Sequence, residues 1–173
     1  MLYFYSVKNK SYYFFLYNHY MKKSLKQELY DRCKIKLEER INSFENAMKN
    51  AQAASNSEDK SSAGDKYETS RAMGQLDRDM NAKQFVEAQN EYASLLKIFI
   101  TNESEKVIAG SMIETNIGIY FIAAGIGTIE LESVNKTVIV LSPRSPLAMA
   151  FMGKKKSDTI HFNNKSFQII QLS

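Results

Sequence analysis

The 173-residue sequence predicts an α+β protein, in which an N-terminal antiparallel α-helical hairpin is followed by a small antiparallel β-sheet domain with one short helix. Apolar residues recur at helical spacing, without proline, from about residue 22 to 54 and again from about 65 to 98. Beyond them the chain changes to short β-branched runs separated by turn residues. This change predicts a helical hairpin over residues 21–100 and a sheet domain over residues 101–173.

The first 20 residues contain nine of the chain's 20 tyrosines and phenylalanines, without a period or a small-residue cleavage site. Their apolar run is also much shorter than the roughly 20 residues that span a bilayer, so no membrane partner is expected, with a peripheral anchor as the minor alternative. Because the composition changes abruptly at Met21, we expect translation to start there and residues 1–20 to be an extension without a structural role.

The first helix has an apolar stripe in which the later residues alternate steps of three and four, the spacing of a heptad seam. The stripe consists of Leu25, Leu29, Cys33, Leu37, Ile41, Phe44, Met48 and Ala51. The single cysteine is expected to be a small buried side chain in a reducing compartment, so the protein is expected in the cytoplasm.

The second helix repeats the pattern, although its phase slips after the third apolar residue. Its predicted stripe is Met73, Leu76, Met80, Phe85, Ala88, Tyr92 and Leu95. Two long helices joined by a short connection run antiparallel, so the polar segment 56–68 forms the tip of the hairpin. The slipped stripe leaves the oligomeric state open between a monomer and a dimer.

Six runs in the C-terminal part have the composition of half-buried strands. They cover residues 106–114, 117–124, 127–133, 137–142, 158–162 and 167–172. Ser145 and Pro146 are suited to the N-cap and first position of a short helix that Gly153 ends. The pair Asn163-Asn164 predicts a tight hairpin turn between the last two strands.

Charge and motifs exclude several classes of function. The formal charge is +4, with the two signs interleaved, which says little about nucleic acid. The sequence has no Walker loop, dinucleotide-binding glycine pattern, zinc spacing or nucleophile elbow. His161 lies in a predicted strand with no second histidine or cysteine near it in the sequence, so a solvent-facing or hydrogen-bonded histidine is expected.

Several C-terminal motifs together resemble the bacterial Gre family of transcript cleavage factors, in which an antiparallel coiled coil precedes an FKBP-like domain. They are Gly110-Ser111 in the predicted first strand, Ser145-Pro146 before the short helix, and the series 151–155 ending in Gly-Lys-Lys. The sequence departs from the family at Ser157, where glycine is common. The resemblance covers about residues 21–173 and implies the fold of that family.

The tip of the hairpin resembles the acidic tip of the family less closely. The series Gly64-Asp65-Lys66-Tyr67-Glu68 reproduces an acidic spacing, and the resemblance implies that Asp65 and Glu68 are the catalytic and metal-binding acids, with Glu58 and Asp59 in reserve. Two acids three residues apart in a first helical turn share one face. Acids are also favoured there by the helix macrodipole alone, so helix capping is the alternative interpretation.

A second alignment of the tip, on Tyr67 and Arg71, places Ala63 and Lys60 where the acids would fall. Lys60 and Lys66 are interleaved with the acids, where they would either dilute the negative field or contact RNA phosphate, and the resemblance adds Arg71 as a candidate partner contact. On the C-terminal domain the resemblance adds Ser145, Pro146, Lys154 and Lys155 as candidate partner contacts. The alternative for the two lysines is that positive charge is favourable after a helix C-terminus.

The resemblance implies that the hairpin enters the secondary channel of RNA polymerase and stimulates cleavage of the nascent RNA 3′ end in backtracked complexes. The protein would not be an independent enzyme, because Mg²⁺ would be shared with the polymerase and not bound stably by the protein alone. Two metal ions would then stabilise the attacking and leaving oxygens. Two alternatives remain: a non-catalytic regulator that binds in the channel, and a coiled-coil adaptor unrelated to transcription.

Overall fold

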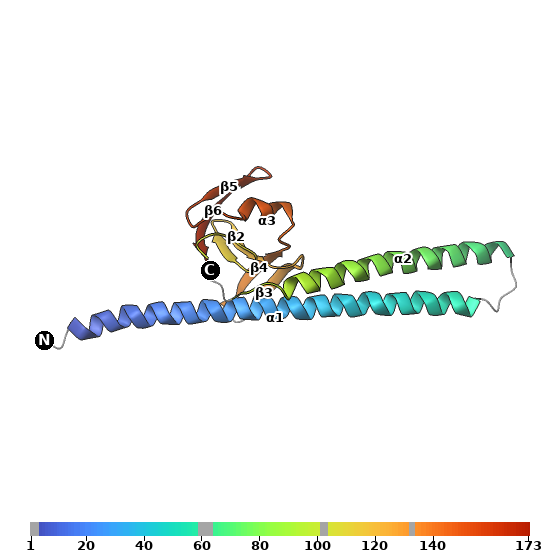
Figure 1. The fold of residues 1–173 in the computed structure, drawn as a ribbon, viewed down its shortest axis with the longest axis horizontal. Coiled ribbons are helices and arrows are strands. Elements are labelled where there is room, and N and C mark those ends of the chain that lie inside the picture. The colour runs from blue at the N-terminus through green and yellow to red at the C-terminus, as the bar shows by residue number, and fades with distance from the viewer. Residues whose placement is uncertain (1–3, 59–63, 101–103, 132–133) are drawn as a thin grey trace. The chain divides into compact units, whose positions relative to one another are not determined.

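The computed structural model describes residues 4–58, 64–100, 104–131 and 134–173 (Figure 1). Within the helices, the side chains of residues 4–24, 55–58, 64–68, 70 and 71 are not described. The chain divides into two compact units, one formed by residues 1–33 and 98–173 and the other by residues 34–97. Each unit is described by itself below.

The N-terminal part of the chain forms two long helices, as the periodicity predicts. Helix α1 spans Phe4–Glu58 and helix α2 spans Gly64–Leu95. The backbone is therefore helical from Phe4 onward, while the start of translation at Met21 stays a prediction.

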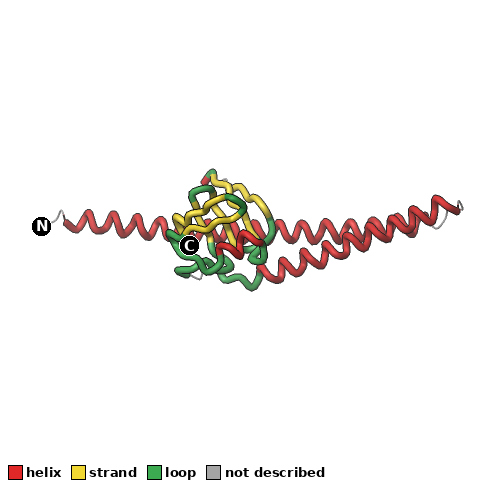
Figure 2. The backbone as a smooth tube through the Cα atoms, turned by 90° about the horizontal axis from the view of Figure 1, so that it is seen from above, coloured by secondary structure: helices red, strands yellow, loops and turns green. Residues whose placement is uncertain are grey.

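Within the unit of residues 34–97, polar side chains connect the two helices. The Arg40 guanidinium lies 3.3 Å from the Glu91 carboxylate. The Tyr92 hydroxyl donates to Glu38, and Arg78 donates to Gln52 over 2.9 Å. Residues later in α1 contact residues earlier in α2, as expected for antiparallel helices. Figures 1 and 2 both show the two helices of this unit side by side.

The buried side of α2 follows one heptad register. Ala88 is 3% exposed and Leu95 is fully buried, with Phe85 and Tyr92 half-buried between them. The spacing of three and four residues extends back to half-buried Asn81, not to Met80.

The prediction that the first three apolar residues of α2 belong to the buried stripe is wrong. Met73, Leu76 and Met80 are 56, 53 and 61% exposed. They precede the phase slip, and a shift of one residue turns a helical position by about 100° away from the seam. The periodicity of the sequence therefore assigned to one stripe apolar residues that lie on two different faces of the helix.

The C-terminal part forms one six-stranded sheet in the order β3-β4-β2-β1-β6-β5. The strands are β1 Met112–Thr115, β2 Gly118–Ile122, β3 Gly127–Leu131, β4 Lys136–Leu141, β5 Thr159–Phe162 and β6 Lys165–Leu172. Helix α3 spans Pro146–Phe151 and lies over one face of the sheet (Figure 1).

The prediction of a purely antiparallel sheet is wrong, because β2 and β4 pair in parallel. Strand β3 pairs antiparallel with β4, so β4 is inserted between β3 and β2. The consecutive order of the β-runs along the chain cannot reveal this insertion, since the sheet order depends on which edges meet in three dimensions. The other three strand pairs are antiparallel.

The first predicted strand is also shorter than expected. Strand β1 begins at Met112, so Gly110-Ser111 precedes it. Gly110 has φ +90°, and a Cβ there would lie 2.8 Å from the Ile98 Cγ2 atom. Both the backbone conformation and the close approach therefore require glycine at this position. The Ser111 hydroxyl accepts a hydrogen bond from the Ile108 amide over 3.0 Å.

The sheet face beneath α3 holds one hydrophobic core with an aromatic centre. The rings of Tyr120, Phe151 and Phe167 contact one another, with centroid distances between 5.4 and 5.9 Å. The buried members of this core are Val107, Ile113, Tyr120, Ile122, Ala148, Phe151, Ile160, Phe167 and Ile169. Close packing of these rings fixes the position of α3 against β5 and β6.

The opposite face of the sheet is also buried. Because side chains alternate along a strand, Phe121, Val138 and Val140 point away from the aromatic core, yet each is at most 1% exposed. In the same unit α1 passes along this face, and the Arg32 guanidinium donates to the Glu130 carbonyl over 3.2 Å. Helix α1 therefore serves as the second layer over the sheet between Leu25 and Cys33.

Candidate functional site

The acidic segment that the sequence singles out lies at the start of α2. That helix begins at Gly64, which places Asp65 and Glu68 in and just after its first turn, three residues apart. Residues at this spacing share one side of a helix. Their side chains are among those that the structure does not describe, so their assignment as catalytic and metal-binding acids stays a prediction.

The other tip residues are placed only in part. Glu58 is the last residue of α1, and Lys66 and Arg71 lie in α2, all three without described side chains. Asp59 and Lys60 fall outside the described residues. Among the residues that are described, no group of three or more histidine, cysteine, aspartate or glutamate side chains could hold a metal ion.

Helix α3 begins and ends as predicted, whereas the role of its residues as partner contacts stays a prediction. Ser145 is the N-cap of α3 and its hydroxyl accepts from the Ala148 amide over 3.3 Å, while Pro146 is the first helical residue. Gly153 follows the helix with φ +76°, the left-handed conformation that ends many helices. Pro146 is exposed and Ser145 half-buried, so the proline is the more accessible of the two.

The lysines after α3 are exposed, and their backbones are held in place. The Lys154 carbonyl accepts from the Val107 amide over 2.8 Å. The Lys155 amide donates to the Asp158 carboxylate over 2.8 Å, and Lys155 also forms an isolated bridge with Lys106. Both side chains are therefore exposed on a hydrogen-bonded turn, and their role as partner contacts stays a prediction.

Ser157 adopts a backbone conformation that favours glycine. Its φ is +75°, within the left-handed region that L-residues rarely adopt. Its amide donates to the Ile169 carbonyl over 2.8 Å, which holds the turn against β6. Ser157 therefore holds this turn at a cost in backbone strain.

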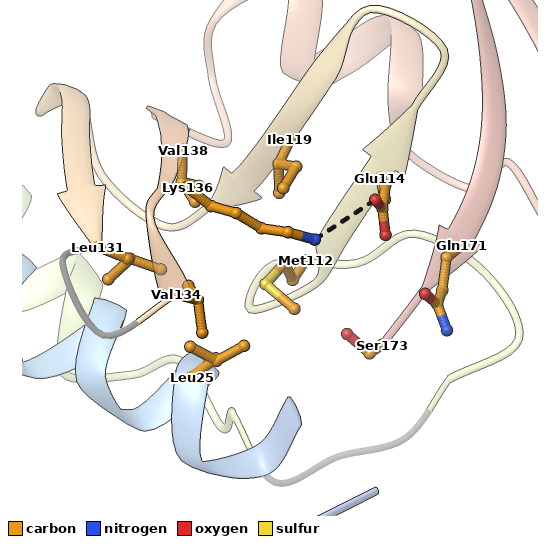
Figure 3. Close-up of a pocket in the computed structure, with 10 residues that line it drawn as sticks. All are labelled: Leu25, Met112, Glu114, Ile119, Leu131, Val134, Lys136, Val138, Gln171 and Ser173. Atoms are coloured by element: carbon orange, nitrogen blue, oxygen red, sulfur yellow. Dashed lines mark ion pairs between the residues drawn. The ribbon is translucent and has the colours of Figure 1, made fainter. Parts of the chain in front are cut away.

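Sequence reasoning missed a cavity on the sheet face that α1 covers (Figure 3). Its volume is about 230 Å³, and ten described residues line it. They are Leu25, Met112, Glu114, Ile119, Leu131, Val134, Lys136, Val138, Gln171 and Ser173. No local motif marks this site, because its residues come from α1, from five strands or their ends, and from separations of more than 100 residues.

The strand register explains how the cavity residues meet. Glu114 pairs with Ile119 on one side and with Gln171 on the other, and Ile119 pairs with Val138. These four residues form one row across β4, β2, β1 and β6. Lys136 lies two residues before Val138 on β4 and therefore on the same face. Its ammonium nitrogen lies 3.6 Å from a Glu114 carboxylate oxygen (Figure 3).

The remaining titratable feature is the phenol of Tyr120. Burial in the aromatic core raises the pKa of Tyr120 above its ordinary value, because a phenolate would lose its hydration there.

His161 is exposed on β5, as expected, and Cys33 is buried. No helix within the described part of the chain combines the length and apolar character needed to cross a membrane.

The fold and these sites define an α+β protein with two N-terminal helices, a six-stranded mixed sheet and one short helix on that sheet. Comparison of the chain with known protein families and with curated proteins finds no match.

Proposed function

We propose that the protein is an RNA polymerase-binding elongation factor of the Gre type, which inserts the acidic start of α2 into the secondary channel and stimulates cleavage of backtracked RNA. The observation that carries the proposal is the order of its parts. Two long helices with antiparallel contacts are joined in sequence by an acidic segment and are followed by a sheet domain with a Ser145-capped helix. The finer identities, a hairpin coiled coil and an FKBP-like domain, are part of the proposal.

The length of α2 suits such a task. Its 32 residues extend about 48 Å at the usual rise of 1.5 Å per residue. A helix on its own would fray, so contacts to α1, such as the pair Arg40–Glu91, stiffen it. A stiff helix can carry the acids at its N-terminal end into a channel that is too narrow for a sheet domain.

The proposed role of Asp65 and Glu68 is to complete the coordination of a Mg²⁺ ion that the polymerase already holds. Their carboxylates are hard oxygen ligands at a spacing that suits one ion, and two such ligands bind Mg²⁺ too weakly without further ones. The ion would supply charge stabilisation at the phosphate under attack. The protein's own contribution is to position the two carboxylates, which is why it is expected to be inactive without polymerase.

The exposed turn after α3 is the proposed docking surface on the polymerase. Lys154 and Lys155 are exposed and their backbones are hydrogen-bonded, and Pro146 is exposed at the first position of the capped helix α3. Lys60, Lys66 and Arg71 would contact the polymerase or the RNA phosphates near the tip. Positive side chains on a rigid element favour an anionic partner surface and speed encounter with it.

The test is RNA cleavage in a purified, backtracked elongation complex with the Asp65→Ala/Glu68→Ala double variant. We expect the protein to release 3′ RNA fragments rapidly and the double variant to lose this by roughly 100-fold, the usual effect of removing a charge-stabilising group. The matched control is Asp77→Ala/Asp79→Ala, which removes two exposed acids from the same helix. This control should keep full stimulation.

Polymerase pull-down with the same proteins separates the rival interpretations. Binding without any stimulation of cleavage would contradict the cleavage factor and indicate a channel-binding regulator. No retention of polymerase at moderate salt would contradict both and indicate an adaptor for another protein.

A further inference from the structure

The cavity between α1 and the sheet has a composition that is suited to one class of small molecule. Six of its ten lining residues are apolar, and they come from α1, the sheet and the segment before β4. The volume of about 230 Å³ corresponds to seven or eight waters at about 30 Å³ each. A molecule with a similar number of non-hydrogen atoms would therefore fill it.

The polar side of the cavity carries two opposite charges. The Lys136 ammonium and the Glu114 carboxylate lie 3.6 Å apart, beyond the 2.7–3.2 Å usual for a hydrogen bond. Each is partly exposed, with 51 and 40% of the side chain accessible. Lys136 has three donors and Glu114 two acceptor oxygens, so a ligand can bind both without breaking a close pair.

The pair of charges discriminates among ligands. A simple anion at Lys136 would face the Glu114 carboxylate, and a simple cation at Glu114 would face the Lys136 ammonium. A zwitterion with adjacent carboxylate and ammonium groups satisfies both at once. The Gln171 amide and the Ser173 residue lie on this polar side and supply further hydrogen-bonding groups (Figure 3).

The floor of the cavity is held by the sheet. The Met112 amide donates to the Ser173 carbonyl over 2.8 Å, and the Ser173 amide donates to the Met112 carbonyl over 3.0 Å. The row Val138, Ile119, Glu114 and Gln171 is fixed by strand pairing. A site built on paired strands keeps its geometry without the ligand, which lowers the entropic cost of binding.

We propose that this cavity binds a free α-amino acid with an aliphatic side chain, of the leucine or methionine class. The side chain lies among Met112, Ile119 and Val138, the carboxylate pairs with Lys136, and the ammonium pairs with Glu114. This inference is independent of the function proposed for the tip of α2.

The test is isothermal titration of the full-length protein with leucine and methionine, beside three analogues of leucine. The analogues are 4-methylpentanoate, isoamylamine and glycine, which lack the ammonium, the carboxylate and the side chain respectively. We expect saturable binding of leucine or methionine and at least ten-fold weaker binding of each analogue. No saturable binding of either amino acid at about 10 mM, ten times a millimolar Kd, or equal binding of an analogue, would overturn the proposal.

Two charge variants locate the site, Lys136→Gln and Glu114→Gln, each of which removes one charge; Glu114→Gln keeps the side-chain length, and Lys136→Gln shortens the side chain by one atom. Each should weaken binding of the amino acid at least ten-fold. The matched control is Lys49→Gln, which removes the cation of the exposed Glu45–Lys49 pair on α1 and should leave binding unchanged. Unchanged binding in both cavity variants would exclude this site. If a variant does not fold by circular dichroism, the analogue series on the wild-type protein decides.

Discussion

Tyr120 couples the stability of the sheet domain to alkaline pH. Tyr120 is 5% exposed, and its ring centroid lies 5.4 Å from that of Phe151. Because burial raises its pKa, the neutral phenol is favoured in the folded state. Its contribution to stability is fully present below the ordinary tyrosine pKa of about 10 and is lost as pH rises through the higher folded-state pKa.

We therefore expect the free energy of unfolding to fall with pH above about 10, and to fall less steeply in Tyr120→Phe, which has no phenol to ionise. Urea denaturation at a series of pH values from neutral to strongly alkaline measures both slopes. Parallel slopes for the two proteins would contradict the assignment, since the loss would then come from other tyrosines.

Ser157 gives a prediction of opposite sign, because its replacement should stabilise the protein. Its φ of +75° is strained for serine and free of strain for glycine. The left-handed conformation costs an L-residue about 1–2 kcal/mol. Glycine removes this cost, but it also raises the conformational entropy of the unfolded chain, which offsets part of the stabilisation. Ser157→Gly should therefore raise the free energy of unfolding by about 0.5–1 kcal/mol.

The matched control for Ser157→Gly is Ser166→Gly, in the middle of the pairing between β5 and β6. Glycine in a strand costs about 0.5–1 kcal/mol, so this variant should be less stable than the wild type. Chemical denaturation of the two variants measures both effects. A loss of stability in Ser157→Gly would mean that the serine side chain makes a compensating contact.

At the scale of elements, two adjacent leucines at the end of helix α2 differ in burial. Leu95 is fully buried and Leu96 is 51% exposed. Leu95→Ala should lower the free energy of unfolding by about 2–5 kcal/mol, the range for a buried leucine. Leu96→Ala should change it by no more than about 0.5 kcal/mol, as for most surface sites. Equal effects in thermal denaturation would contradict the heptad register described for α2.

The elements themselves follow local rules, and most could be predicted. Ser145, Pro146 and Gly153 define α3 because capping, a fixed φ and a left-handed residue act within a few residues. Asn163 and Asn164 form the hairpin turn with φ of +47° and +60°. The exposed Met73, Leu76 and Met80 were not predicted, because the partner helix decides which of two apolar faces is buried.

At the scale of the whole molecule, the boundary between the parts matters for folding. The sheet domain was predicted to extend over residues 101–173, whereas the compact unit that contains the sheet also includes residues 1–33. A fragment of residues 98–173 would expose Phe121, Val138 and Val140, which are buried on the face along which α1 passes. A large exposed apolar face makes a soluble domain prone to association.

We expect the fragment 98–173 to bind a hydrophobic dye and to aggregate, and a fusion of residues 21–33 to this fragment to fold. Dye fluorescence and the dispersion of amide resonances in an NMR spectrum measure the difference. A well-folded, monomeric 98–173 fragment would contradict the role of α1 as the second layer over the sheet.

The sequence by itself determined the helices, the strands, the capped α3 and the turn at Asn163, because these depend on neighbours within a few residues. It also singled out Asp65 and Glu68 from their spacing, although their role rests on a resemblance. Only the tertiary structure decided the parallel pairing of β2 with β4, the buried register of α2 and the cavity with Glu114 and Lys136. Each of these depends on contacts between segments far apart in the chain, where loop closure and packing choose among arrangements that local patterns leave equivalent.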